Sequence, residues 1–283
     1  AANQWLAETP AVILTTQLSP TDGQWNGLMT KVDVQLDDRE GGRVAWVTMD
    51  NERRLNAGSL ELVEQLKAVF DSLASDEDLR AVVLTGAGER AFMAGADLND
   101  LSKLNPTTGR YFITQLHTAA EAIRGCPVPV VGRLRGFCLG AGLELAAACD
   151  FRVADESFIM GMPEVKVGLP SVIEAALLPR LVGWGKAREI LLTGTNFGAK
   201  EALEMRFVEK LVPAAELDAW VGVWLEKILE AGPVAVRTQK ALIGQWEELD
   251  LSAAIEAGIE VFGEAFETDE PNRMLSSFMK LES

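Results

Sequence analysis

Hydrophobic and polar positions change period several times along the first half of the chain. Residues 32–36 alternate apolar and polar side chains, Gly41-Gly42 follows, and residues 44–47 form a second apolar run. This pattern is typical of a β-hairpin with a glycine turn. Between residues 59 and 75, apolar side chains recur at helical spacing with charged ones between them. The chain therefore begins its ordered part with a predicted hairpin and an amphipathic helix.

Strands and helices then alternate. Residues 81–86 form a short apolar run that ends in glycine, which is typical of a buried strand, and a helix is predicted over 111–123. Strands are predicted at 128–131 and 151–154, with a helix of small residues over 141–149 between them. Alternating strands and helices predict an α/β fold. The short strands favour a β-β-α unit over a plain Rossmann alternation.

The two ends of the chain differ from this α/β region. Residues 1–30 show no clear period, and we expect an N-terminal arm or extended cover. The α/β core is predicted over 31–197. Beyond Gly198 the patterns are almost all helical, so residues 198–283 are predicted to form a second domain or an oligomerisation region.

Composition narrows the classes of function. The 283 residues include 42 acidic residues and 26 lysines and arginines, for a net charge of −16. Such a chain is a poor binder of nucleic acid or anionic membranes, because phosphate contacts need clustered basic residues. The single histidine, His117, excludes a multi-histidine zinc site, and we expect no metal. Carboxylates are the best candidates for proton chemistry.

Cysteine content and hydropathy indicate the compartment. Three cysteines are an odd number in a long chain, which argues against a disulfide framework. No uninterrupted apolar run approaches the ~20 residues of a membrane span. The first residues lack the basic region of a signal peptide. We therefore expect a cytoplasmic protein.

A glycine-rich loop at 136–142 leads directly from a predicted strand into a helix. The first N–H groups of a helix are unpaired and carry the positive end of its dipole, so this loop could bind a phosphate or stabilise an oxyanion. It is not a dinucleotide fingerprint, because Leu145 stands where the third glycine would fall. Tight packing of helix on sheet through small residues is the alternative interpretation.

Two glutamates lie in apolar surroundings near this loop. Glu144 falls in the first turn of the helix, and Glu164 follows twenty residues later. Separately, each is more often a solvated group. Together, two carboxyl groups can hold a water and move protons to and from carbon, and their mutual repulsion separates their pKa values.

Other candidates carry weaker signals. The loop 90–98 is also rich in small residues and could offer another backbone N–H, or Asp97 could simply cap a helix. His117 is more typical of a packed histidine than of a catalytic one. Glu174 is a further acid in apolar company, and Arg53-Arg54 is a basic pair that could meet a ligand phosphate or be solvated.

The motifs resemble those of the crotonase superfamily, the enoyl-CoA hydratase/isomerase family, from about Val32 to Phe278. The stretches that carry this resemblance are Leu55-Asn56-Ala57, 91–97, 136–144 with Cys149-Asp150, 162–168 and 178–183. The resemblance implies a spiral of β-β-α units followed by helices that build homotrimers, often paired into homohexamers. It also implies an acyl-CoA thioester as substrate, with coenzyme A as part of the substrate and no separate cofactor.

The resemblance also assigns roles to residues. Backbone N–H groups of Ala94 and Ala141 would form an oxyanion hole for the thioester oxygen. Glu144 and Glu164 would share a water, with Glu164 favoured as the donor of a proton to C2 and Glu144 as the activator of water. The CoA moiety would be bound by Arg53, Leu55, Ala94, Gly95, Ala96 and Asp97.

Departures from the family pattern concern the acyl group. Alanine replaces a common glycine at position 141, and Ser171 to Leu177 replaces a glycine-rich stretch, so His117, Ser171 and Glu174 are candidates for the acyl pocket. The sequence predicts an enoyl-CoA hydratase acting in acyl-CoA and fatty acid metabolism. The alternatives are enoyl-CoA isomerisation, thioester hydrolysis or C–C cleavage by the same fold, and a non-catalytic protein that has retained the fold.

Overall fold

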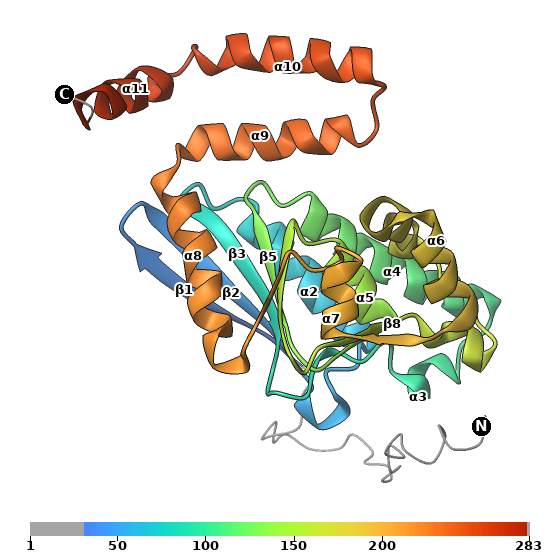
Figure 1. Ribbon diagram of the computed structural model, residues 1–283. Helices are drawn as coiled ribbons and strands as arrows, with labels where there is room; N and C mark the ends of the chain where they lie inside the picture. The colour runs from blue at the N-terminus through green and yellow to red at the C-terminus, as the bar shows by residue number, and fades with distance from the viewer. Residues whose placement is uncertain (1–30, 282–283) are drawn as a thin grey trace.

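The structure is a computed structural model that describes residues 31–281, so the predicted arm 1–30 lies outside the described residues. A six-stranded sheet forms the centre (Figure 1). Its order is β1 (Lys31–Arg39), β2 (Gly42–Asp50), β3 (Leu79–Gly86), β5 (Val130–Leu134), β7 (Phe151–Asp155) and β10 (Lys210–Val212). The predicted hairpin is confirmed, since β1 and β2 pair antiparallel around Gly41, while the other pairs are parallel.

Side chains of the large sheet alternate between two apolar layers, as the period of a strand requires. On one face, Ala45, Val82 and Leu84 belong to the main core. This core includes residues of α2 (Leu60–Leu73), α4 (Pro106–Arg124) and α5 (Ala141–Ala147). On the other face, Val44 and Val83 pack with α8 (Leu217–Glu230). Because both faces are covered, β3 is buried along its whole length.

A second, four-stranded sheet contains β4 (Ala91–Met93), β6 (Phe137–Leu139), β8 (Ile159–Gly161) and β9 (Asn196–Gly198). Each of β3, β5 and β7 is followed by one of its strands and then by a helix or 3-10 turn, which confirms the β-β-α unit. The strands β4, β6 and β8 are parallel neighbours, so their carboxyl ends meet at one edge. The loops that leave this edge carry the candidate site residues.

The helices after this unit fall into two groups. The helix α6 (Leu178–Thr193) bends at Gly183, where φ is 78°, and α7 (Ala199–Glu204) follows β9. Short connecting helices complete the chain, and their bounds are α3 (Leu98–Leu101), η1 (Glu52–Arg54), η2 (Pro163–Val167), η3 (Ile173–Leu177) and η4 (Ala214–Glu216). The helices α9 (Pro233–Trp246), α10 (Leu251–Ala265) and α11 (Glu270–Leu281) extend away from the sheets (Figure 1).

The C-terminal region also contributes to the body of the fold. The strand β10, which the sequence pattern did not predict, pairs parallel with β7, and α8 covers the large sheet. Three-residue strands such as β4, β6 and β10 are too short to show a period of two, which explains why the sequence analysis interpreted their residues as loop or helix. Within residues 31–281, no helix is long and apolar enough to cross a membrane.

Candidate active site

Loops from the carboxyl ends of β4, β6 and β8 meet at one place. Gly142 packs so tightly on the carbonyl of Met93 that a Cβ there would overlap it. A Cβ on Gly140 would overlap Oε1 of Glu164 and lie 3.8 Å from Cα of Gly95. Gly140 also has φ 50° and ψ −121°, a conformation that other residues avoid. Glycine is therefore required where the second loop approaches the first loop and Glu164.

Ala141 begins α5, whose seven residues are all buried. As the first helical residue it has no partner within the helix for its N–H, and none is found among residues 31–281. The role of this N–H as a donor to a ligand oxygen stays a prediction.

The first loop gives a different result for Ala94. Its N–H donates to the carbonyl oxygen of Leu55 at 3.0 Å, so it is not free to bind a substrate oxygen. Leu55 adopts a left-handed conformation with φ 55°, and this turn directs its carbonyl toward the loop. The expectation that Ala94 supplies an oxyanion donor is therefore wrong, because a backbone hydrogen bond already uses that group.

Ala96 offers the free donor in that loop. Gly58 pairs with it in a parallel bridge, in which Gly58 N–H donates to Gly95 at 2.8 Å and Asp97 N–H donates to Gly58 at 3.0 Å. Ala96 is the central residue of this bridge, between the two residues that bond to Gly58. Its own N–H and carbonyl therefore point away from Gly58. No partner for Ala96 N–H is found in the described part of the chain. The sequence pattern did not contain this signal, because it depends on the register of the bridge.

Glu144 is buried, with only 5% of its surface exposed. Its Oε1 accepts a hydrogen bond from the backbone N–H of Ala175 at 3.2 Å. Burial, as the largest cause, raises the pKa of Glu144 to about 8, and the negative charges of Glu164 and Glu174 act in the same direction. The hydrogen bond from Ala175 lowers the pKa but does not outweigh these effects. The surroundings of Glu144 therefore favour its protonated form in the free site.

Glu164 lies on η2, directly after β8, and is half-buried. The hydroxyl of Ser171 donates to its Oε2 at 2.8 Å, while its Oε1 lies against Gly140. Ser171 was expected in the acyl pocket, and the structure gives it a direct contact with one of the two expected catalytic acids.

His117 and Glu174, the other two acyl-pocket candidates, contact each other. Nδ1 of His117, on α4, lies 2.8 Å from Oε1 of Glu174, on η3. Glu174 is 4% exposed, and its Oε2 is buried with no hydrogen-bond partner among the described residues. The sequence analysis identified both residues but not this contact, since they are 57 positions apart.

The residues expected to bind the CoA moiety lie on η1 and on the loop after β4. Arg53 is exposed and has no polar partner among residues 31–281. Arg54 forms an ion pair with the buried Asp97, with Nη1 and Oδ2 2.5 Å apart. Burial opposes ionisation of Asp97, but Arg54 and the N–H groups of Asn99 and Asp100 outweigh it and lower its pKa. Asp97 also caps α3, as the structural interpretation of this loop expected.

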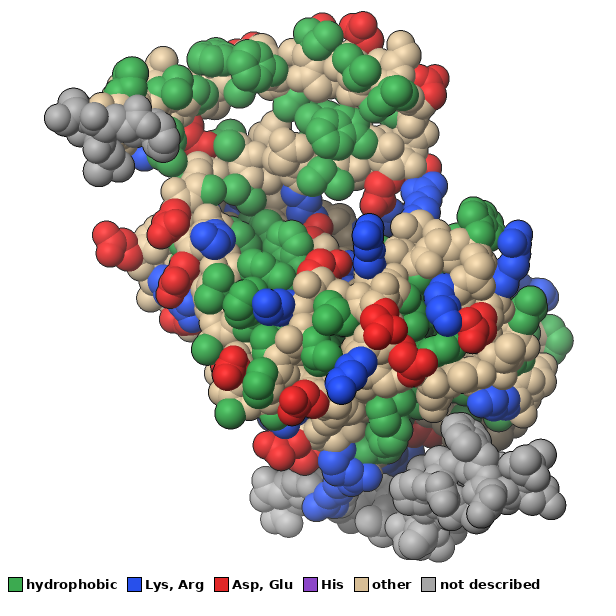
Figure 2. All heavy atoms as spheres, viewed as in Figure 1, with side chains coloured by type: hydrophobic (Ala, Val, Ile, Leu, Met, Phe, Trp, Pro, Cys, Tyr) green, Lys and Arg blue, Asp and Glu red, His purple; other side chains and the backbone are tan. Residues whose placement is uncertain are grey.

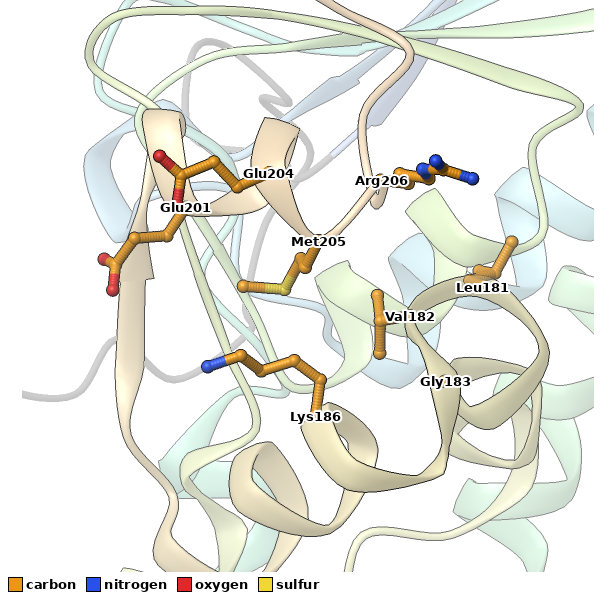
Figure 3. A pocket seen from close by; sticks show the side chains of 8 residues that line it. All are labelled: Leu181, Val182, Gly183, Lys186, Glu201, Glu204, Met205 and Arg206. Carbon is orange, nitrogen blue, oxygen red and sulfur yellow. The ribbon is translucent and has the colours of Figure 1, made fainter.

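A separate cavity of about 550 Å³ lies between α6 and α7 (Figure 3). Its lining residues are Leu181, Val182, Gly183, Lys186, Glu201, Glu204, Met205 and Arg206. None of the candidate site residues lines this cavity. Within the described residues, no cluster of three His, Cys, Asp or Glu side chains could hold a metal ion.

The chain is similar to known proteins of one family over most of its length. A profile of the family described as "Enoyl-CoA hydratase/isomerase" matches residues 39–282. The chain is 34% identical over 240 residues to a short-chain-enoyl-CoA hydratase of Clostridium acetobutylicum, covering 84% of this chain and 92% of that one. It is 30% identical over 239 residues to a crotonyl-CoA hydratase of Syntrophomonas wolfei, with the same coverage.

Solved structures are similar over most of their length. A crystal structure of an enoyl-CoA hydratase from Bacillus anthracis superposes with a TM-score of 0.84 at 32% identity, covering 88% of this chain and 96% of that one. One from Mycobacterium smegmatis gives 0.83 at 29% identity, covering 87% and 96%. The similarity therefore extends over the whole α/β body.

Proposed function

The chain belongs to the enoyl-CoA hydratase/isomerase family, and from this premise we propose that it hydrates the 2,3 double bond of a 2-enoyl-CoA. The observation that carries the proposal is the pair Glu144 and Glu164. Glu164 lies against Gly140, and Glu144 lies in the short helix that begins at Ala141, whose N–H has no partner among the described residues. The similar hydratases named above act on short-chain and crotonyl thioesters. Crotonyl-CoA is therefore the first substrate to test.

The thioester oxygen would bind between the backbone N–H groups of Ala96 and Ala141. Both groups lack a partner among the described residues, and their loops are in contact through Gly95 and Gly140. When water adds at C3, negative charge develops on this oxygen as the thioester becomes an enolate. Two fixed donors stabilise that charge, and losing one can cost ~10²–10³ in rate.

The two glutamates would transfer the protons. The oxygen of a water molecule bonds to C3 while a carboxylate takes its proton, and a carboxylic acid gives a proton to C2, so the sum is the addition of H₂O. Such a step needs one ionised and one protonated acid. Burial raises the pKa of Glu144, which favours Glu144 as the protonated acid in the free site. That is the reverse of the roles that family precedent favours.

The CoA end of the substrate would lie along η1 and the loop 94–97. Arg53 and Arg54 are the basic residues there, and Arg54 is fixed by Asp97. These two arginines provide local positive charge for the CoA phosphates in a chain whose net charge is −16.

Isomerisation of the double bond is the second candidate. It moves a proton between C2 and C4 and can be performed by a single acid, and the buried Glu174, which acts on Glu144, is a further acid that could take part in it. Assays with 2-enoyl-CoA and 3-enoyl-CoA substrates separate the two, because only a hydratase forms a 3-hydroxyacyl product. Binding of CoA esters without turnover of either substrate would instead indicate a non-catalytic protein.

Substitution of the glutamates tests the proposal. We expect Glu144→Gln and Glu164→Gln each to lower kcat for hydration of crotonyl-CoA by about 10²–10⁴, because each removes a group that transfers a proton in the transition state. The loss of absorbance of the conjugated thioester measures this rate. Glu121→Gln, at an exposed position of α4, is the matched control and should keep wild-type activity. Unchanged turnover in both site variants would contradict the assignment.

Assembly and compartment are part of the same proposal. A homotrimer or homohexamer would cover the exposed apolar side chains of α10, which Figure 2 shows along the uppermost helix. The three cysteines are buried free thiols, which suits the reducing cytoplasm. The reaction as written needs no cofactor beyond the CoA moiety of the substrate.

A further inference from the structure

Glu174 is a buried acid that the hydration chemistry leaves without a role. It is 4% exposed, and an ionised carboxyl group in such a place is costly unless it is paired. His117 provides the pairing from α4 at 2.8 Å, and the imidazole is itself half-exposed. The second carboxyl oxygen of Glu174 is buried without a hydrogen-bond donor among residues 31–281.

The segment that carries Glu174 contacts both candidate catalytic acids. Ser171 donates to Glu164, and the N–H of Ala175 donates to Glu144. Between them, Ile173 has φ 43°, a conformation rare for a β-branched residue, although its side chain packs against the main core. Such strain persists only where surrounding contacts impose it, and it is concentrated at functional sites. The segment 171–175 is thus a fixed support for the two glutamates.

The charged groups that act on Glu144 are Glu164 and Glu174, both acids. The elements that pack most extensively against α5 are η3, α4, β4 and β6. The strand β4 carries no titratable side chain, and β6 carries only the buried thiol of Cys138. On α4, His117 contacts Glu174. Arg124 is paired with Glu247, and the remaining charged or titratable side chains are exposed. Those remaining side chains are Arg110, Tyr111 and Glu121.

Hydrogen-bond donors are scarce in this cluster. Three carboxyl groups face three donors, which are the hydroxyl of Ser171, the N–H of Ala175 and the ring of His117. Glu144 and Glu174 are both buried, so ionising both is costly, and a proton retained by one of them turns an acceptor into a donor. The hydrogen-bond donors available to each carboxyl group decide which one retains the proton.

We propose that Glu174, held by His117, is a positioning residue for Glu144, and that its carboxylate keeps the proton on Glu144. Glu174 is buried in the segment whose Ala175 N–H bonds to Glu144, so a negative charge on Glu174 disfavours a second charge on Glu144, and the contact with His117 holds the carboxyl group of Glu174 in place. The role in turnover rests on the proposed function, whereas the protonation of Glu144 is a property of the free protein.

Two variants of Glu174 separate charge from packing. Glu174→Gln removes the charge and leaves an amide that can still bond to His117. Glu174→Met removes the charge and the hydrogen bond, and its side chain has a volume similar to that of glutamate. Infrared titration of the free protein, with the matching Glu144→Gln background subtracted, follows the carboxyl C=O band of Glu144. We expect both variants to shift its midpoint to lower pH by about half a unit or more. Glu121→Gln is the matched control on α4 and should leave the midpoint unchanged.

The pH profile of kcat/KM for crotonyl-CoA gives the second readout. The limb that Glu144 governs should move to lower pH by the same amount, and its direction reports the role of Glu144. A limb that falls with pH indicates an acid, and a limb that rises indicates a base. A purely structural role for Glu174 would lower the melting temperature and kcat without moving either midpoint.

The outcomes distinguish the two proposals. An unchanged midpoint in Glu174→Gln, or a shift to higher pH, overturns the role of Glu174, even if Glu174→Met loses activity. If Glu174→Met does not fold, Glu174→Gln alone decides. Absence of hydration in the wild-type protein would refute the proposed function, but the infrared titration would still decide the role of Glu174.

Discussion

At the scale of single residues, the chemistry of the site depends on how strongly one acid is buried. Glu144 lies in a short helix of small apolar residues, and burial is the largest cause of its raised pKa. In the proposed hydration, a proton held by Glu144 would be available for transfer to carbon. The same burial lowers the stability of the fold, because the unfolded chain ionises this group more easily.

The consequence for stability can be measured. The folded protein keeps a proton that the unfolded chain releases above pH 4.5, so this group makes the free energy of unfolding fall as the pH rises from 4.5 to about 8. Glu144→Gln removes this dependence. We expect the variant to be more stable than the wild type by about 3 kcal/mol at pH 7 and equally stable near pH 4. Urea unfolding at both pH values measures the difference. Equal stability of the two proteins at pH 7 would show that Glu144 is ionised in the fold.

At the scale of elements, carboxylates also fix how helices meet. Glu270, the first residue of α11, accepts hydrogen bonds from the N–H groups of Val234 at 3.1 Å and Ala235 at 2.8 Å. These are among the first N–H groups of α9, which have no partner within that helix. The carboxylate also lies at the positive end of the helix dipole. One buried side chain therefore joins the start of α11 to the start of α9.

Removing this cap should loosen α9. We expect Glu270→Ala to lower the local stability of α9 by about 1–2 kcal/mol, because two N–H groups lose their acceptor. Hydrogen exchange of the α9 amides should become faster, with the α2 amides unaffected. Glu267→Ala, three residues earlier and exposed, serves as the control. Identical exchange of α9 in both variants would exclude a capping role.

At the scale of the whole molecule, the C-terminal helices leave apolar surface uncovered. No residue of α10 is buried, although Leu251, Ile255, Ile259 and Phe262 recur at helical spacing and are 56–78% exposed. The helix packs on α9, away from the sheets (Figure 1). An apolar stripe of this kind is typical of an interface. The proposed homo-oligomer would bury it against another copy of the chain.

Charges on this stripe should prevent assembly. We expect the double variant Ile255→Glu and Phe262→Glu to form a smaller species than the wild type, because a buried interface would have to desolvate two carboxylates. Light scattering coupled to gel filtration measures the mass. Glu256→Gln, exposed on the same helix, is the control and should keep the wild-type mass. An equal mass for the double variant would place the interface elsewhere.

Local signals in the sequence were sufficient for much of the fold and for the two acids. The alternation at 32–47 and the helical spacing at 59–75 depend on neighbours a few positions apart, and the structure contains the hairpin and α2 there. Glu144, Glu164 and Glu174 were identified by acids standing in apolar stretches. Burial follows from such a stretch, so the sequence already indicated which carboxyl groups would be perturbed.

Tertiary structure decided which of these residues meet and which groups remain free. The hydrogen bond from Ala94 to Leu55 and the bridge between Gly58 and Ala96 join segments about 40 positions apart, so the choice of Ala96 over Ala94 could not be read from the loop itself. The pairing of His117 with Glu174 likewise depends on how α4 packs against η3. Sequence determines local periodicity and chemistry, whereas hydrogen-bond partners are assigned only when distant segments pack together.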